Sequence, residues 1–343
     1  MLIARAPVRI SFFGGGTDLP AYFERYGGLV VSAAIDRYIY VVLNRRPGDP
    51  LDITSSDYRA HYRHRRGESL LGEGDLALPR AVLEVFNVQS GMSVFVASQI
   101  PPGTGLGGSS AVAVALVKAV STLKGLRLAP TDIAALAGEV EIQKLGFPIG
   151  LQDQYASAFG GLNSIAFSAD GVQVHPLRLS VETLVELQRN VLLFFTGTAR
   201  HSGSILGRQR SATAHGEGVV LDSLHQLKEM ASVARGLLEN GKLGEFGRLL
   251  NDAWEHKKRL VQGISNARID EAYSAARALG ALGGKITGAG GGGFLLLYCE
   301  PPHQGAVTAA LDALEMARFD VHFDFTGAHV LMNASGELAA DAA

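Results

Sequence analysis

Several features that mark specialised classes of protein are scarce in this sequence. It has one cysteine, Cys299, which excludes an internal disulfide and favours a reducing compartment. It has no uncharged apolar run of the roughly 20 residues that a membrane span needs. Arg5 and Arg9 interrupt the first apolar stretch, which argues against a secretory signal. We therefore expect a cytoplasmic protein without a membrane partner.

An excess of one charge is also absent. The 31 lysines and arginines nearly balance the 33 aspartates and glutamates, so electrostatic attraction to nucleic acid is not expected. At 343 residues the chain is long enough for two domains with their own cores. We expect a small-molecule partner and no nucleic acid. The sequence leaves the oligomeric state open, a homodimer included.

Glycine is plentiful, and the most informative glycines lie in the segment 101–111, P-P-G-T-G-L-G-G-S-S-A. This segment joins an apolar, strand-like run to an apolar, helix-like run. Glycines let the backbone approach a phosphate closely, and the free N–H groups at a helix start face it with the positive end of the helix dipole. The segment therefore predicts a loop that cradles phosphate groups.

Spacing separates three kinds of phosphate loop. Gly103 and Gly108 have the G-x-x-x-x-G spacing of a Walker loop, but Ser109 follows where that loop needs lysine. Gly103, Gly105 and Gly108 also satisfy the G-x-G-x-x-G of dinucleotide folds, but no acid ends a following strand, so that interpretation is disfavoured. The remaining interpretation is a loop whose paired serines, Ser109 and Ser110, meet a magnesium ion that bridges nucleotide phosphates.

The loop, P-x-G-x-G-L-G-x-S-S-A, resembles the nucleotide-binding motif of the GHMP small-molecule kinases. Segment 6–18, A-P-V-R-I-S-F-F-G-G-G-T-D, is similar to the first motif of that family, and segment 285–293, K-I-T-G-A-G-G-G-G, is similar to its third. The three motifs keep the family order and span most of the chain. The resemblance implies an ATP-dependent kinase that uses Mg²⁺. It also implies an α+β, two-domain fold with a ribosomal-protein-S5-like N-terminal domain and a ferredoxin-like C-terminal domain.

Hydrophobic periodicity and turn residues predict elements in both halves. The predicted strands cover 28–46, 91–100, 191–196, 294–299 and 321–325. The predicted helices cover 75–88, 109–124, 131–145, 218–239, 242–262, 266–282 and 304–318, and Thr131 is the expected N-cap and Gly146 the expected stop of the third. Strands and helices do not alternate strictly, which favours α+β layers in both halves.

Turn residues at 169–171 and Pro176 suggest a domain boundary near residue 180. We predict an N-terminal domain 1–180, a C-terminal domain 181–333 and a flexible tail 334–343. A hairpin at 169–171 would give the same pattern.

The resemblance assigns the nucleotide and metal sites. It implies nucleotide contacts from Pro102, Gly103, Thr104, Gly105, Leu106, Gly107, Gly108, Ser109 and Ser110. It implies a metal held by Ser109 or Ser110 together with Glu141, which lies five residues before Gly146 as in the family's Glu-x-x-x-x-Gly. Taken alone, Glu141 would read as a solvated helix acid paired with a lysine.

An isolated acid marks the catalytic candidate. Asp153 lies in an otherwise apolar, glycine-flanked segment, where a charge is costly without a partner or a function. By resemblance, Asp153 accepts or orients the proton of the acceptor hydroxyl, and Arg9 of the first motif keeps it ionised. Without the motifs, Asp153 would read as a turn or capping residue and Arg9 as a strand-edge arginine.

The first motif also carries substrate information. Galactokinases have Glu and His where this chain has Gly15 and Gly16, which leaves room for a bulkier sugar, and Thr17 and Asp18 are kept. The pattern looks most like the D-glycero-D-manno-heptose 7-phosphate kinases, and fucokinase-like proteins share parts of it. That likeness implies phosphorylation of an anomeric C1 hydroxyl, on the way to nucleotide-activated heptose for lipopolysaccharide or capsule. Mannokinase-like activity stays open.

Further substrate contacts are expected outside the first motif. Arg200 and Lys258 are candidates for binding a sugar phosphate, although the run 257–259 would equally suit the solvated face of a helix. Thr287, Gly288 and Gly290 of the third motif are expected where the backbone meets phosphate and sugar. A non-catalytic sugar sensor or a decarboxylase of the mevalonate branch would share the fold. The sensor would tolerate loss of the catalytic acid, and the Thr17–Asp18 pair favours a carbohydrate.

Overall fold

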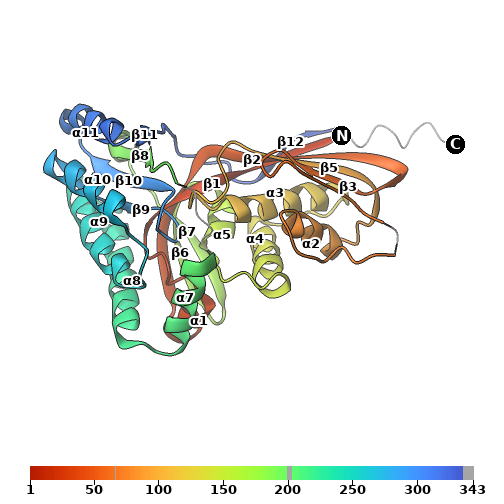
Figure 1. Ribbon diagram of the computed structural model, residues 1–343, viewed down its shortest axis with the longest axis horizontal. Helices are drawn as coiled ribbons and strands as arrows, with labels where there is room; N and C mark the ends of the chain where they lie inside the picture. The colour runs from red at the N-terminus through yellow and green to blue at the C-terminus, as the bar shows by residue number, and fades with distance from the viewer. Residues whose placement is uncertain (66, 199–202, 335–343) are drawn as a thin grey trace.

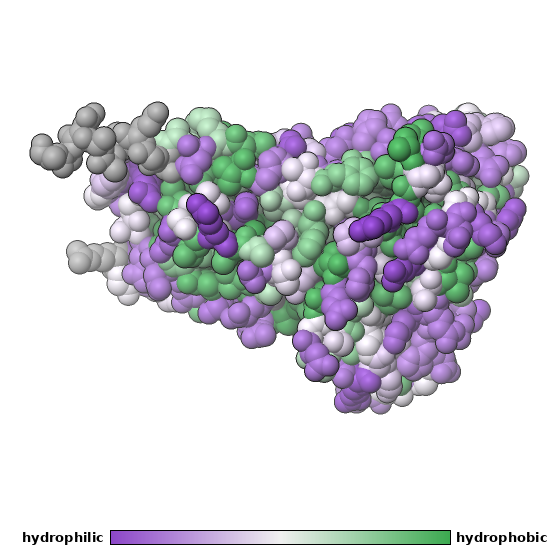
Figure 2. All heavy atoms as spheres, turned by 180° about the vertical axis from the view of Figure 1, so that it is seen from behind, coloured by the Kyte–Doolittle hydropathy of each residue, from purple (hydrophilic) through white to green (hydrophobic). Residues whose placement is uncertain are grey.

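The computed structural model describes residues 1–65, 67–198 and 203–334; of the predicted tail, only residue 334 falls within them. The described elements form two β-sheets with their helices, which appear as two lobes side by side in Figure 1. In the view from behind, a notch in the lower outline separates the lobes (Figure 2). No helix within the described ranges combines the length and apolar character that a membrane crossing requires. The predicted α+β class with two structural halves is confirmed.

The first sheet has eight strands in the order β12-β1-β2-β5-β3-β4, with the hairpin β6–β7 branching from β2. Its strands are β1 (Leu2–Phe13), β2 (Gly28–Pro50), β3 (Asp52–Ser55), β4 (Ala60–Arg63), β5 (Ser90–Ser98), β6 (Leu162–Ser168), β7 (Gly171–Pro176) and β12 (His329–Asn333). All pairs are antiparallel except β3 with β5. The second half of β1 is buried on both faces, so its polar residues need partners inside the protein.

Helices cover one face of this sheet in Figure 1. The helical elements of the N-terminal half are α1 (Pro20–Tyr26), α2 (Ala77–Val85), α3 (Gly108–Leu123), α4 (Pro130–Glu139), the π-helical turn η1 (Val140–Lys144) and α5 (Gln152–Phe159). α3 is apolar around most of its circumference because it lies between the sheet and the helices α2, α4 and α5. This central helix fixes where the glycine-rich loop before it can lie.

The second sheet has four antiparallel strands in the order β11-β8-β10-β9. They are β8 (Val191–Phe195), β9 (Ala281–Ile286), β10 (Phe294–Cys299) and β11 (Ala317–Arg318). The helices of this half are α6 (Val181–Asn190), α7 (Gly203–Ala214), α8 (Gly218–Glu239), α9 (Leu243–Lys258), α10 (Ala267–Ala278) and α11 (Pro301–Ala313). α9 packs on β9 and against α8, and it carries a buried lysine, Lys257, at its C-terminal end.

Some predicted bounds are confirmed and others need correction. The helix 218–239 and the strand 294–299 have the predicted bounds. The turn at 169–171 closes the β6–β7 hairpin, which was the alternative to a boundary there. α6 begins at Val181, and the chain later returns to the first sheet at β12. The exact division near residue 180 stays a prediction.

The predicted cap of the third helix is wrong. α4 begins at Pro130, and Ala129 rather than Thr131 is its N-cap, because proline already has the φ of a first helical residue. The helix continues through the π-helical turn η1, and Gly146, with a φ of 69°, follows its end as predicted.

Three predictions near the C-terminus also change. The helix 266–282 ends at Ala278, because Gly280, at a φ of 108°, turns the chain into β9. The helix 304–318 ends at Ala313, before the short strand β11. The strand 321–325 is wrong: one isolated bridge joins Phe323 to Ile35. Its apolar and aromatic residues have the composition of a strand, but no strand ladder forms there.

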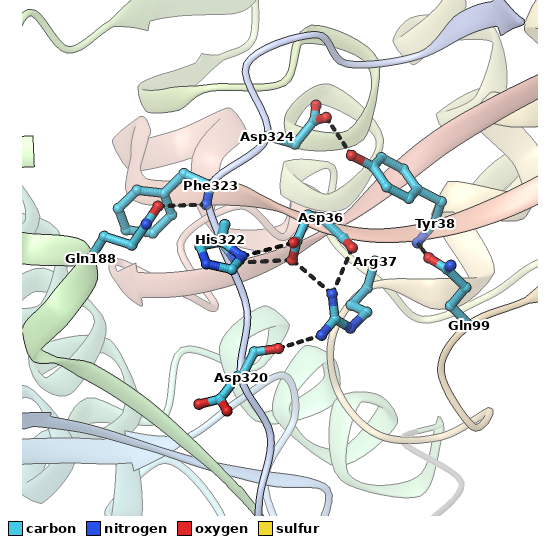
Figure 3. A network of polar contacts seen from close by, with 9 residues as sticks. All are labelled: Asp36, Arg37, Tyr38, Gln99, Gln188, Asp320, His322, Phe323 and Asp324. Carbon is cyan, nitrogen blue, oxygen red and sulfur yellow. Dashed lines mark hydrogen bonds and ion pairs between the residues drawn. The ribbon is translucent and has the colours of Figure 1, made fainter. Parts of the chain in front are cut away.

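Side-chain hydrogen bonds hold this stretch, residues 319–328, which we call the return segment (Figure 3). Asp36 of β2 accepts a hydrogen bond from the His322 backbone N–H at 2.8 Å, and its Oδ2 lies 3.0 Å from His322 Nδ1. Arg37 donates to Asp36 at 2.9 Å and to the carbonyl of Asp320. The Tyr38 hydroxyl donates to Asp324 at 2.9 Å. Side-chain contacts with β2 therefore add to the single bridge and hold the return segment without a strand ladder.

We expect Asp36→Ala to lower the free energy of unfolding by about 1–2 kcal/mol, because hydrogen bonds from His322 and Arg37 lose their acceptor. Urea denaturation measures this change. Asp312→Ala, at an exposed position of α11, is the control and should shift stability by less than about 0.5 kcal/mol. Equal effects of the two substitutions would contradict the role given to Asp36.

Candidate active site

The glycine-rich loop runs from the end of β5 to the start of α3 and lines a cavity of about 400 Å³. Gly103, Gly105 and Gly107 have φ values of 75°, 78° and 78°, which favour glycine. All the predicted nucleotide-binding residues line the cavity except Leu106. Leu106 is buried, and its carbonyl accepts a hydrogen bond from the Arg9 backbone N–H at 2.9 Å. The loop is thus fastened to β1 through Leu106, while its other residues face the cavity.

The third motif lies directly against this loop. Thr287, Gly288 and Gly290 line the same cavity, and the Thr287 hydroxyl donates to the carbonyl of Thr104 at 3.3 Å. A Cβ atom on Gly105 would lie 2.6 Å from the Thr287 carbonyl oxygen. The contact therefore requires glycine, and it joins the two halves of the chain at the cavity.

Arg9 and Asp153 form an ion pair at the centre of the cavity. Arg9 Nε and Nη2 lie 2.7 Å and 2.5 Å from Asp153 Oδ1, and Arg9 Nη1 donates to the Gly105 carbonyl at 2.8 Å. A Cβ on Gly107 would lie 3.1 Å from Asp153 Oδ2, so the loop touches this carboxylate. The arginine side chain is 3% exposed and the aspartate side chain 23%. The two predicted catalytic residues therefore meet, with the aspartate open to the cavity.

Glu141 and the two serines form a second cluster beside the loop. Ser109 donates to Glu141 Oε1 at 2.7 Å, and Gln154 Nε2 donates to Glu141 Oε2 at 2.6 Å and to the Ser110 hydroxyl at 3.0 Å. Burial raises the pKa of Glu141 to about 7, against hydrogen bonds that lower it. Glu141 belongs to the π-helical turn η1, a distortion often found at functional sites. Both serines thus come within reach of one carboxylate.

This cluster fits a magnesium ion that is also held by a nucleotide. Hydroxyl and carboxylate oxygens are the donors that Mg²⁺ prefers, and such sites commonly use one or two carboxylates with substrate phosphates. Within the described residues no group of three or more His, Cys, Asp or Glu side chains could hold a metal alone. The protein donors are therefore consistent with a metal that arrives with the nucleotide.

Asp18 of the first motif lies in the same cavity. Its Oδ1 accepts from the Gly16 N–H at 2.8 Å and its Oδ2 from the Gln152 N–H at 3.3 Å. Burial and the charge of Asp153 raise the pKa of Asp18. A Cβ on Gly150 would lie 1.9 Å from Asp18 Oδ2, so this approach requires glycine.

The other predicted residues of the first motif divide into two groups. Gly15 and Gly16 line the cavity beside Asp18. Thr17 does not, because its side chain is fully buried in the turn. Its hydroxyl donates to the Gly14 carbonyl at 2.8 Å and accepts from the Leu29 N–H at 3.1 Å. Thr17 therefore shapes the turn that presents Asp18.

The predicted phosphate contacts need revision. Lys258 does not line the cavity; its Nζ pairs with Glu255 at 2.8 Å and lies over the Trp254 ring. Lys257 points inward instead, and donates to the carbonyls of Ile286 at 3.0 Å and Gly288 at 2.6 Å. Arg200 lies outside the described residues.

Two buried lysines were missed from the sequence. Burial, and then the charge of Arg9, lower the pKa of Lys285 to about 7, and burial and Lys285 lower the pKa of Lys257 well below its usual value. Helical spacing could have found Lys257, because it continues the buried stripe that contains Leu250 and Trp254. Lys285 directly precedes the third motif, but that position alone does not show that its side chain turns into the cavity.

Other polar residues around the cavity were also missed, among them Ser11, Gln152 and Gln209. Gln154, which orients Glu141, was missed as well. No spacing in the sequence marks these residues, because they come from β1, α5 and α7. The cavity thus combines a glycine-rich loop that can hold phosphates, oxygen donors for a cation, the Arg9–Asp153 ion pair and a group of buried polar side chains. This arrangement suits phosphoryl transfer to a hydroxyl group held beside Asp153.

Comparison with known proteins agrees with this chemistry. The family model for the GHMP kinases N terminal domain matches residues 77–161, and the model for GHMP kinases C terminal matches residues 234–315. A D-glycero-alpha-D-manno-heptose 7-phosphate kinase of Campylobacter jejuni is 32% identical over 313 residues, which are 90% of this chain and 92% of that protein. A mevalonate kinase of Thermococcus sibiricus is 29% identical, over 90% of this chain and 92% of that protein.

A solved structure shows the same fold. The crystal structure of a D-glycero-D-manno-heptose 1-phosphate kinase from Bacteroides thetaiotaomicron superposes with a TM-score of 0.79 at 29% identity. The match covers 98% of this chain and 100% of the other.

We expect Lys285→Met to stabilise the protein near pH 7 by about 1–3 kcal/mol, because a buried ammonium is costly. The pKa of Lys285 falls from 10.5 to about 7 on folding, so the unfolded chain binds more protons between these values. The stability of the natural protein therefore rises with pH across this window, and the cost of Lys285 is fully present below it. Urea denaturation near pH 7 and near pH 9.5 should show the advantage of Lys285→Met shrinking at the higher pH.

Lys124→Met, at an exposed lysine, is the control for this experiment and should change stability by less than about 0.5 kcal/mol at both pH values. An advantage of Lys285→Met that does not depend on pH would show that loss of the buried charge is not its cause.

Proposed function

The chain belongs to the GHMP kinases and is an ATP-dependent phosphotransferase, and we propose that it phosphorylates the anomeric C1 hydroxyl of a mannose-configured sugar. The best candidate acceptor is D-glycero-D-manno-heptose 7-phosphate, which would give the 1,7-bisphosphate for nucleotide-activated heptose in lipopolysaccharide or capsule synthesis. The observation that carries the proposal is the meeting of the Arg9–Asp153 pair with Asp18 and the glycine-rich loop in one cavity.

The nucleotide half of the proposal rests on the loop and on the apolar end of the cavity. The loop glycines and the start of α3 would hold the phosphates, with N–H groups at the positive end of the helix dipole. Tyr58, Leu76, Leu78 and Ile100 line the cavity beyond the loop and offer an apolar surface for adenine.

Magnesium would be held by Ser109 and Glu141, with Ser110 as the alternative hydroxyl. Direct contact with Glu141 favours Ser109, since Ser110 accepts its hydrogen bond from Gln154. When bound, the ion would neutralise charge that develops on the phosphates. Gln154 fixes Glu141 by a hydrogen bond of 2.6 Å and so orients the carboxylate toward the serines.

Asp153 would accept or orient the proton of the acceptor hydroxyl. Its Oδ1 is bound by Arg9, while its Oδ2 faces Gly107 of the phosphate loop. Asp153 therefore sits between the expected phosphates and the acceptor end of the cavity. This is the position that a proton acceptor or a hydroxyl-orienting group needs.

The sugar assignment rests on the acceptor end of the cavity. Asp18 offers a carboxylate to sugar hydroxyls, and Gly15 and Gly16 line the cavity with it. The relatives named above as heptose phosphate kinases, one by sequence and one by structure, support the heptose candidate. The mevalonate kinase at 29% identity supports only the reaction class. Arg200 stays our candidate for binding the phosphate of the sugar itself.

A panel assay tests the acceptor. ADP release should be measured with ATP, Mg²⁺ and D-glycero-D-manno-heptose 7-phosphate, free heptose, mannose, fucose or mevalonate, and the phosphorylated position read by NMR. We expect the highest kcat/KM with the heptose 7-phosphate, and phosphate on C1. Phosphate on another hydroxyl would refute anomeric transfer. Measurable sugar binding without turnover of any acceptor would favour a sugar-sensing protein on the kinase fold.

We expect Asp153→Asn to lower kcat by a factor of about 10²–10⁴ and to change the KM for ATP by less than about threefold, because the amide cannot accept the hydroxyl proton. Steady-state kinetics with saturating acceptor measures both constants. Asp57→Asn, the same change at another acid that lines the cavity, is the control. A kcat close to that of the natural protein would remove Asp153 from the proton transfer.

A further inference from the structure

Three buried polar atoms at the acceptor end of the cavity have no hydrogen-bond partner among the described residues. They are Ser11 Oγ, Gln152 Oε1 and Gln209 Nε2. The three residues are 2%, 8% and 4% exposed, and all line the cavity. An unpaired buried polar atom destabilises the folded state, and such atoms are uncommon in folded proteins. Three of them around one cavity point to a ligand that completes their hydrogen bonds.

The side chains that carry these atoms lie next to Gly15 and Gly16. A Cβ on Gly15 would lie 3.4 Å from Ser11 Oγ, 3.7 Å from Gln152 Nε2 and 4.0 Å from Lys285 Nζ. A Cβ on Gly16 would lie 2.4 Å from Gln209 Nε2. Gly16 therefore lets Gln209 approach the turn closely, while Ser11, Gln152 and the Lys285 ammonium lie around Gly15.

The residues of this group come from four separate elements. Ser11 lies on β1, Gln152 begins α5, Gln209 lies on α7 and Lys285 lies on β9. α7 packs against α1, and α1 directly follows the turn that carries Asp18. A helix of the second half of the chain therefore lies next to the first motif. Gln152 also donates its backbone N–H to Asp18, which couples its position to that carboxylate.

The chemistry of the group favours a polyhydroxylated ligand. A hydroxyl and two amides each donate and accept hydrogen bonds, as the neighbouring hydroxyls of a sugar do. Asp18 accepts from hydroxyls but repels a carboxylate, which disfavours an acceptor that carries its own carboxylate at this point. Lys285 donates one hydrogen bond, to the Phe12 carbonyl at 3.1 Å, and has further N–H groups to offer.

We propose that Ser11, Gln152 and Gln209 bind hydroxyl groups of the acceptor sugar that are not phosphorylated, and so determine which sugar is accepted. This inference rests on the proposed function, because it assigns residues to the acceptor of that same reaction. A site built to hydrogen-bond a substrate hydroxyl discriminates strongly against an analogue without it, since its buried polar groups are then left unpaired. The three residues are specificity residues, while Asp153 carries the proton.

The test compares Gln209→Leu and Ser11→Ala with the natural protein, using the best acceptor of the panel and its monodeoxy analogues. We expect each substitution to raise the KM for the acceptor about tenfold or more, with kcat and the KM for ATP changed by less than about threefold. We also expect each variant to lose preference for the full sugar over one particular deoxy analogue. A purely structural defect would weaken all the analogues alike.

Gln226→Leu, the same change at an exposed position of α8, is the control and should leave every constant within about twofold. Calorimetric binding of the sugars in the presence of a non-hydrolysable ATP analogue gives the same comparison without turnover. If circular dichroism shows that Gln209→Leu disturbs folding, the test uses Ser11→Ala alone.

The outcomes separate the inference from the proposed function. A natural protein that phosphorylates a sugar, with variants whose preference among the deoxy analogues is unchanged, refutes the inference and leaves the proposed function standing. A natural protein that neither binds nor phosphorylates any sugar, and accepts mevalonate instead, refutes both. Loss of preference for one hydroxyl in each variant supports both.

Discussion

The ion pair between Arg9 and Asp153 is the contact on which the active site depends. Arg9 comes from the first motif, and it also binds the carbonyl of Gly105 in the phosphate loop through its side chain and that of Leu106 through its backbone. Asp153 in turn touches Gly107. One arginine therefore joins the glycine-rich loop to Asp153, and under the proposed function it would set the distance between the phosphates and the acceptor hydroxyl.

More ionisable side chains are buried around this pair than is usual in a protein core. Lys257 and Lys285 are buried close to Arg9, and Asp18 and Glu141 are buried close to Asp153. Burial shifts the pKa of each of these groups toward its neutral form. An anionic nucleotide and a cation would place opposite charges beside these groups. We infer that the site gives up stability to bind its substrates, a common trade at functional sites.

Much of this site could be predicted, because motif residues act through their backbone or through neighbours close in sequence. The glycines of the phosphate loop fall into this class, whereas Asp153 was found as an isolated acid in an apolar, glycine-flanked segment. Lys258 was the wrong choice because the charge run 257–259 does not show which lysine continues the buried stripe of α9. Thr17 was assigned to the substrate because the sequence does not show which way a turn directs its hydroxyl, and here the hydroxyl closes the turn.

By itself, the sequence determined the reaction class and the order of the motifs, because glycine spacing and paired serines are local features that can be recognised without knowing how the chain packs. Only the tertiary structure shows which side chains line the cavity near Asp18. Gln209 and Lys285 come from α7 and β9, and their approach to Gly16 and Gly15 depends on how the second half of the chain packs on the first. Contacts between residues far apart in sequence leave no spacing to read, so the residues proposed to choose the sugar become visible only in the folded chain.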